Sequence, residues 1–177
     1  MASLRTKDVW NGAAAAIDYQ TGEIIAYVGS ANYYESRRVN KRIQPQFDVL
    51  SDGWRQPGSA FKPFNYVTGI DALWTGMDRV FAMSQAMGMR FLEQAPPGPS
   101  MALGTLEVHP LDLVTSYATL ANGGRYLGHA AILSVKDVNG TDVIPPYEVP
   151  DGTQTVSAAA ASIVTDILAG NTDPAEN

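Results

Sequence analysis

Turn-forming residues divide this chain into short segments, and their positions set the expected order of strands and helices. The turn residues 18–23 separate two apolar runs, residues 13–17 and Ile24–Val28, which is typical of a β-hairpin. Asn139-Gly140 is the strongest short signal for a second hairpin. Segments with helical spacing lie between and after these hairpins. We therefore expect an α+β fold, with an antiparallel sheet flanked by helices rather than a parallel sheet wound by βαβ units.

Four segments have the apolar spacing and the end signals of helices. The clearest is Pro110–Ala121, because proline suits the first helical position and Gly123-Gly124 suits a left-handed stop. The methionines of residues 77–89 fall at helical spacing and are expected to fill the core. The expected helices cover residues 59–71, 77–89, 110–121 and 156–168, and the proline-rich residues 94–100 are expected to form a loop.

Composition excludes several classes of function. The 177 residues suffice for one domain, and a net charge of −6 argues against a nucleic-acid partner. The chain has no cysteine and only two histidines, His109 and His129, which lack the spacing of metal ligands. We therefore expect no metal and no cofactor. The basic cluster in residues 37–42 is expected to be a solvated loop; the alternative is a rim that attracts an acidic substrate.

Ser59 and Lys62 are the candidate catalytic residues. Residues three apart share one face of a helix, so the two side chains should lie one turn apart. A serine hydroxyl becomes a strong nucleophile when a neighbouring base takes its proton, and a lysine acts as that base in its neutral form. The backbone N–H of Ser59, at the start of the helix, is expected to form half of an oxyanion hole, with a strand edge supplying the second donor.

The S-x-x-K spacing alone leaves a structural alternative open. Ser59 can be a helix N-cap and Lys62 a solvated surface residue, because one chance match is unremarkable in a chain with this many serines. Pro63 disfavours the helical region for Lys62 and is compatible with a helix only in its first turn.

The flanking sequence adds a family resemblance. Gln56-Pro57-Gly58-Ser59-Ala60-Phe61-Lys62-Pro63-Phe64 closely resembles the active-site serine motif of class A penicillin-binding proteins, the bifunctional cell-wall synthases. Further stretches resemble the same family in the same order, over nearly the whole chain. They are residues 16–29 (its first sheet hairpin), 102–104 with 110–113 and 117–124 (a later helix), 135–140 (a following hairpin) and 157–168 (the helix before its third motif).

The resemblance implies a penicillin-binding transpeptidase fold, similar to that of serine β-lactamases, and acyl transfer on peptidoglycan stem peptides. Ser59 would attack the carbonyl of the penultimate D-Ala and release the terminal D-Ala, while Lys62 would take the serine proton. β-Lactams would act as mimics that leave a stalled acyl-enzyme. The parent protein would be anchored at the extracytoplasmic face of a bacterial membrane and carry a glycosyltransferase domain.

Two of the three family motifs are missing. No lysine precedes Thr-Gly, so the third motif, K-T-G, is absent. Ser30-Ala31-Asn32 has the letters of the second motif, S-x-N, but precedes Ser59 and is interpreted as coincidence. We therefore expect residues 1–177 to be a partial domain, with one segment missing between residues 71 and 72 and another after 177. The alternative is an inactive remnant or interaction module of the same fold.

Overall fold

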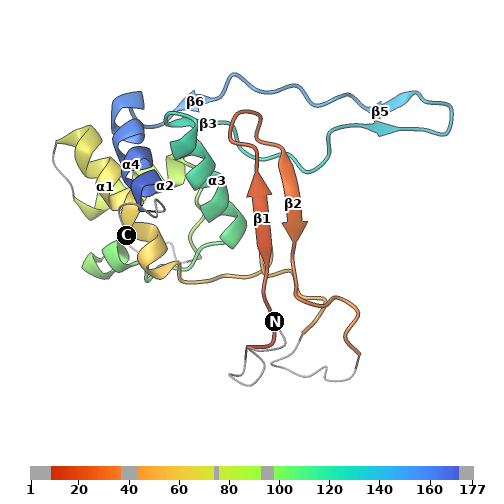
Figure 1. Cartoon of the computed structure of the whole chain (residues 1–177), viewed down its shortest axis with the longest axis horizontal. Coiled ribbons are helices and arrows are strands. Elements are labelled where there is room, and N and C mark those ends of the chain that lie inside the picture. Colours follow the sequence, from red (N-terminus) through yellow and green to blue (C-terminus); the bar gives the residue numbers. More distant parts are fainter. Residues whose placement is uncertain (1–8, 37–43, 74–75, 93–97, 172–177) are drawn as a thin grey trace.

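The structure is a computed structural model that describes residues 9–36, 44–73, 76–92 and 98–171 (Figure 1). The basic cluster in residues 37–42 and part of the expected loop 94–100 lie outside the described residues. Two short 3-10 helices, η2 (Gly58–Phe61) and η3 (Pro99–Leu103), accompany the regular elements. In chain order these are β1 (Ala14–Ile17), β2 (Ile24–Val28), α1 (Lys62–Ala72), α2 (Met77–Ala86), α3 (Pro110–Ala121), β3 (Arg125–Tyr126), β4 (Val135–Lys136), β5 (Asp142–Ile144), β6 (Thr153–Gln154) and α4 (Ala158–Gly170).

The strands form antiparallel pairs, which confirms the expected α+β class. β1 pairs with β2, β4 with β5 and β3 with β6, so the described strands make three two-stranded sheets rather than one continuous sheet. Both expected hairpins are present. The β3–β6 pair was not expected, because strands of two residues carry no periodic signal.

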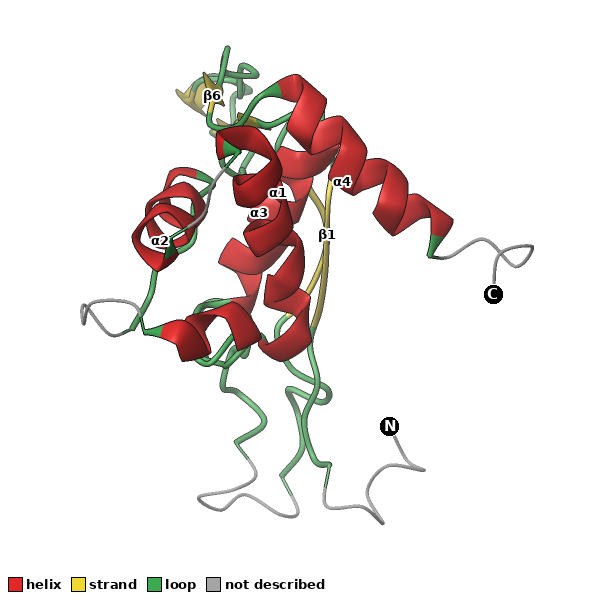
Figure 2. Cartoon of the chain, turned by 90° about the vertical axis from the view of Figure 1, so that its left-hand side faces the viewer, coloured by secondary structure: helices red, strands yellow, loops and turns green. Residues whose placement is uncertain are grey.

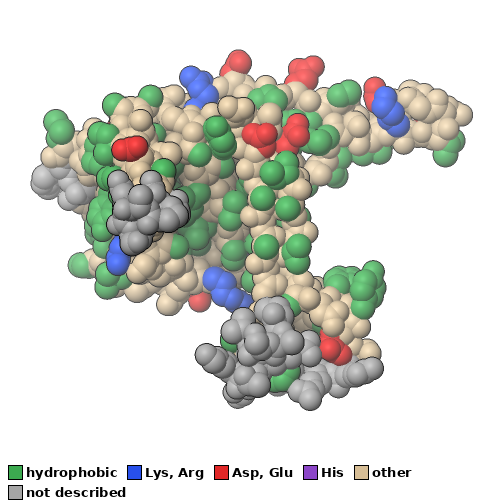
Figure 3. Space-filling model, in the orientation of Figure 1, with side chains coloured by type: hydrophobic (Ala, Val, Ile, Leu, Met, Phe, Trp, Pro, Cys, Tyr) green, Lys and Arg blue, Asp and Glu red, His purple; other side chains and the backbone are tan. Residues whose placement is uncertain are grey.

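Helices cluster on one side of the β1–β2 hairpin, and the β4–β5 hairpin projects from the opposite side (Figure 1). α3 packs against β1, while α4 packs against both α1 and α3 (Figure 2). β2 is apolar and exposed at Ile25, Tyr27 and Val28, and Figure 3 shows hydrophobic side chains along this hairpin. The hydrophobic core therefore lies among the helices and not between sheets.

The core is built from side chains that α1, α2, α3 and α4 turn toward one another. Phe64 and Val67 of α1 are fully buried against Val80 of α2 and Ala161 of α4. The methionine prediction is confirmed, since Met87 and Met89 are also buried there. α2 itself ends at Ala86 and not at 89, because the chain turns at Gly88, which has φ +99°.

Both ends of α3 and the start of α4 follow their sequence signals, whereas α4 continues to Gly170, beyond its expected end at residue 168. Pro110 is the first residue of α3, and Gly123 after its end has φ +63°. α4 begins after Ser157, whose hydroxyl accepts the backbone N–H of Ala160 at 3.3 Å. The backbone N–H of Ser157 in turn donates to Asp71 Oδ1 at 2.8 Å, which ties the start of α4 to the end of α1.

A charged pair fixes α3 against the strand-like segment after α2. Asp112 is almost completely buried and accepts from Arg90 through Nε at 2.8 Å and Nη2 at 2.9 Å. It also accepts the backbone N–H of Arg90 at 3.2 Å. The Arg90 side chain is largely exposed, so water also solvates its positive charge. The buried carboxylate of Asp112, in contrast, depends on these three hydrogen-bond donors.

We expect Asp112→Ala to lower the free energy of unfolding by about 2 kcal/mol, because hydrogen bonds to charged groups contribute about 1.5–3 kcal/mol. Urea denaturation measures the change. The matched control is Asp142→Ala, which removes the exposed ion pair with Lys136 and should change stability by less than about 0.5 kcal/mol. Equal losses in the two variants would contradict a special contribution from the buried carboxylate.

His129 should make stability depend on pH. Its Nδ1 lies 2.9 Å from the Thr115 hydroxyl, and burial lowers its pKa, with Asp112 opposing and Arg90 adding to that effect. The unfolded state then binds more protons, so the stabilising contribution is complete above the ordinary value of about 6.5 and is lost as pH falls below it. Thermal unfolding between pH 8 and pH 5 should show a smaller loss for His129→Gln than for the unmodified chain. Identical pH profiles would disprove this contribution.

Candidate active site

A sharp turn brings Ser59 and Lys62 together at the start of α1. Gly58 has φ +56°, a conformation that favours glycine, and η2 begins there. The backbone N–H of Lys62 donates to the carbonyl of Ser59, so Lys62 follows Ser59 by one 3-10 turn. Pro63 is accommodated in the first turn of α1, where no α-helical hydrogen bond requires its N–H.

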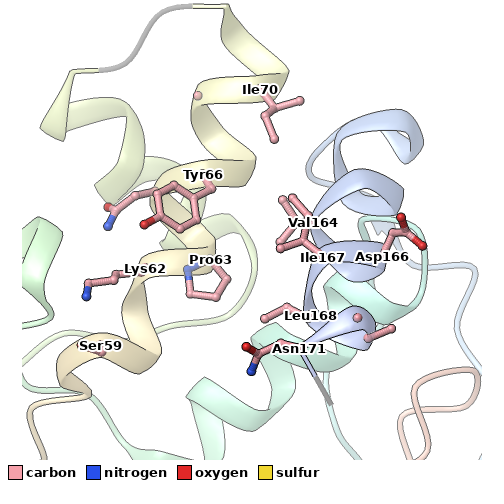
Figure 4. Close-up of a pocket in the computed structure, with 14 residues that line it drawn as sticks. Ser59, Lys62, Pro63, Tyr66, Ile70, Val164, Asp166, Ile167, Leu168 and Asn171 are labelled. Carbon is pink, nitrogen blue, oxygen red and sulfur yellow. The ribbon is translucent and has the colours of Figure 1, made fainter. Parts of the chain in front are cut away.

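The two side chains differ in exposure but share one surface. Ser59 is exposed and Lys62 is half-buried. Figure 4 shows Lys62 one turn after Ser59 on this segment, and both residues line the same groove. Among the described residues, no acceptor is assigned to the backbone N–H of Ser59, which leaves this N–H available to an oxyanion.

Ser59 and Lys62 border an open groove of about 1450 Å³ between α1 and the C-terminal half of α4. The walls are mostly apolar, and Figure 4 shows Ile70 on one side facing Val164 and Ile167 on the other. Among the described lining residues, Ser59 carries the one aliphatic hydroxyl and Lys62 the one positive charge. Ser30-Ala31-Asn32 follows β2 and does not contribute to this lining.

The described residues offer no group of three or more His, Cys, Asp or Glu side chains that could hold a metal ion. The reactive groups that the arrangement does offer are a hydroxyl, an amine and a helix-start N–H.

Residues far along the chain hold the Ser59 turn, and the sequence analysis did not single them out. The N–H of Gly58 donates to the carbonyl of Gly104 at 3.1 Å, and the Asn65 amide donates to the carbonyl of Ala102 at 2.8 Å. The Tyr117 hydroxyl donates to the carbonyl of Ala60 at 2.8 Å. No local pattern reveals such long-range partners, although the Leu-Gly pair at 103–104 marks a sharp turn.

Comparison with known proteins finds a family model and several relatives that resemble this chain. The family described as "Penicillin binding protein transpeptidase domain" matches residues 12–89, a region that contains β1, β2 and the Ser59 turn. Penicillin-binding protein 2D of Bacillus subtilis is 26% identical, over 85% of this chain and 28% of its own length. Penicillin-binding protein 1B of Vibrio cholerae is 26% identical, over 93% of this chain and 27% of its own length.

Solved structures show the same fold. Penicillin-binding protein 3 of Mycobacterium tuberculosis, complexed with aztreonam, superposes with a TM-score of 0.75 at 17% identity, covering 98% of this chain and 55% of that one. PonA1 of Mycobacterium tuberculosis, in complex with penicillin V, gives a TM-score of 0.68 at 18% identity, covering 93% and 57%. Over residues 12–89 the chain is thus similar to the penicillin-binding protein transpeptidase family, and over nearly its whole length it has the fold of these solved structures. It spans about a quarter of the length of the curated relatives that it matches.

We expect Gly104→Ala to destabilise the fold more than Gly140→Ala. Both glycines have positive φ, +72° and +83°, which costs an L-residue about 1–2 kcal/mol. A Cβ at Gly104 would also overlap the backbone of Gly58, whereas a Cβ at Gly140 meets open space. The overlap should add about 1–3 kcal/mol, measured by urea denaturation. Equal losses would show that the Gly58 backbone moves aside freely.

Proposed function

We propose that this chain contributes the serine-bearing part of a D-Ala-D-Ala transpeptidase, with Ser59 as nucleophile and Lys62 as general base. The observation that carries the proposal is the exposed Ser59 hydroxyl, one turn before Lys62 at the rim of the groove. Both residues lie inside the region that matches the transpeptidase family.

The proposed reaction is acyl transfer in two steps. Lys62, in its neutral form, takes the proton of Ser59 while Oγ attacks the carbonyl carbon of the penultimate D-Ala of a peptidoglycan stem peptide. The amide bond breaks, the terminal D-Ala leaves as an amine that receives the proton, and an ester on Ser59 remains. An amine of a neighbouring stem peptide then attacks the ester carbonyl, a new amide bond forms, the bond to Oγ breaks, and the proton of the amine passes through Lys62 to restore the Ser59 hydroxyl.

The backbone N–H of Ser59 supports this chemistry as one oxyanion donor, because it lies at the start of η2. β-Lactam antibiotics are proposed to acylate the same hydroxyl. Two structural neighbours of this chain are described in complex with penicillin V and aztreonam, which supports the proposal by fold.

We also propose that residues 1–177 form a partial domain that lacks a segment between residues 71 and 72. The alignment to the Bacillus subtilis protein is 198 positions long but covers 85% of these 177 residues, about 150, so the relative has several tens of additional residues within it. Leu73, beside the proposed junction, has φ +56° and is 93% exposed. A left-handed leucine is costly, and its exposure leaves it without packing that would offset the cost.

The parent protein is proposed to be of class A, with a glycosyltransferase domain and a membrane anchor at the extracytoplasmic face. The names of the relatives, penicillin-binding proteins 1A, 1B and 2D, support this assignment. Within the described residues, no helix has the length and apolar character required to cross a bilayer.

An inactive remnant or interaction module is the second candidate, and the missing S-x-N and K-T-G motifs favour it. The described groove reflects that loss, because it holds no second serine and no second lysine. Losing one oxyanion donor costs about 2.7–4 kcal/mol of transition-state stabilisation in comparable enzymes, so this chain alone should acylate slowly.

Labelling with a fluorescent penicillin separates the two candidates. We expect a covalent adduct on Ser59, located by mass spectrometry, that is lost in Ser59→Ala. Lys62→Met should slow its formation by about 10²–10⁴-fold, the usual contribution of a general base.

Ser100→Ala is the matched control. Ser100 is also exposed and is also the second residue of a 3-10 helix, but Leu103 stands where Ser59 has Lys62. The control should label like the unmodified chain. Failure of the unmodified chain to label, after long incubation with excess penicillin, would favour the inactive module.

A further inference from the structure

The carbonyl of Ala60 has no partner within its own helix. In the 3-10 pattern of η2, the donor to Ala60 would be the N–H three residues later, but that residue is Pro63, which has none. The α-helical pattern begins at Lys62, so its first bond uses the carbonyl of Phe61. The proline after Lys62 thus leaves the Ala60 carbonyl without a helical donor in the middle of the Ser59–Lys62 turn.

Tyr117 supplies the missing donor from 57 residues away. Its hydroxyl donates to the Ala60 carbonyl at 2.8 Å. Its ring lies edge-on against Phe64 of α1, with ring centroids 5.1 Å apart, so packing fixes the direction of the hydroxyl. Burial raises the pKa of Tyr117, which keeps the hydroxyl protonated, and therefore a donor, across the neutral range.

Tyr117 differs from the other hydroxyl residues of α3. The hydroxyls of Thr115, Ser116 and Thr119 each bond to a carbonyl of α3 four residues earlier, even though the Ser116 hydroxyl also lies 3.0 Å from the Met87 carbonyl and the Thr115 hydroxyl 2.9 Å from His129 Nδ1. Tyr117 instead reaches out of its helix to the turn that carries Ser59. The contact therefore serves the turn, not the internal stability of α3.

We propose that Tyr117 is a positioning residue that replaces the missing Pro63 N–H and thereby fixes the Ser59–Lys62 turn in its reactive geometry. This inference rests on the proposed acyl-transfer function. Two flanking bonds, Gly58 to Gly104 and Asn65 to Ala102, hold the ends of the same turn. The Ala60 peptide lies between them, so releasing it leaves both ends in place and frees the centre, where Ser59 and Lys62 must meet.

The test is Tyr117→Phe, which removes the hydroxyl and keeps the ring. Tyr147→Phe is the matched control, because the Tyr147 hydroxyl also donates to a backbone carbonyl, that of Thr21, at 2.9 Å, away from the groove. We expect Tyr117→Phe to lower the first-order rate constant of penicillin acylation about tenfold, since small misplacements of reacting groups are costly, with little change in the non-covalent dissociation constant. Tyr147→Phe should acylate at the unmodified rate.

The overturning result is an acylation rate constant for Tyr117→Phe within twofold of that for Tyr147→Phe. A purely structural role would instead lower the unfolding temperature of Tyr117→Phe while leaving its acylation rate constant at low temperature unchanged, and that outcome also overturns the inference.

Amide hydrogen exchange on the full chain keeps the two proposals distinguishable. An unmodified chain that never acylates contradicts the proposed function but leaves the geometry of the turn open to measurement. We expect Tyr117→Phe to speed exchange of the Lys62 amide, which donates to Ser59, at least fivefold over Tyr147→Phe, with α4 amides unchanged. Equal protection of the Lys62 amide in the two variants would overturn the positioning role whether or not the chain acylates.

Discussion

Backbone contact between two distant segments is the constraint on which the candidate site depends. Arg55 and Val108 exchange two hydrogen bonds, at 2.9 and 3.0 Å, immediately before the Ser59 turn. Gly58 and Gly104 then approach so closely that a side chain at position 104 would overlap the backbone of Gly58. The exposed Ser59 hydroxyl is therefore held by the segment 102–117 as much as by its own helix. This arrangement keeps a surface residue in one conformation without burying it.

The sequence predicted the elements well where their signals are local. Pro110 and Gly123 marked the ends of α3, and Asn139-Gly140 marked the turn between β4 and β5. The helix starting near Ser59 was also expected, but its first residues form a 3-10 turn, because Gly58 and Pro63 restrict the backbone on both sides. Local propensity does not distinguish these two kinds of helical turn at a helix start.

What the sequence could not predict depends on pairs far apart in the chain. Ser59 and Lys62 lie within one local motif, residues 56–64, whereas Tyr117 lies 57 residues from the carbonyl that it contacts. The β3–β6 pair could not be predicted for a similar reason. Each strand has only two residues, and the pairing joins Arg125 to the distant Gln154. The groove could not be predicted from the sequence either, because it forms only when α4 packs beside α1.

The separation between Ala60 and Tyr117 has a consequence for the order in which the molecule is made. A ribosome releases the N-terminal half first, and domains fold as units once enough chain has emerged. The turn that carries Ser59 therefore leaves the ribosome well before Gly104 and Tyr117, the residues that fix it. A nascent chain would contain the serine, the lysine and the residues of the turn between them, yet the turn would acquire a set geometry only after α3 had been synthesised and docked.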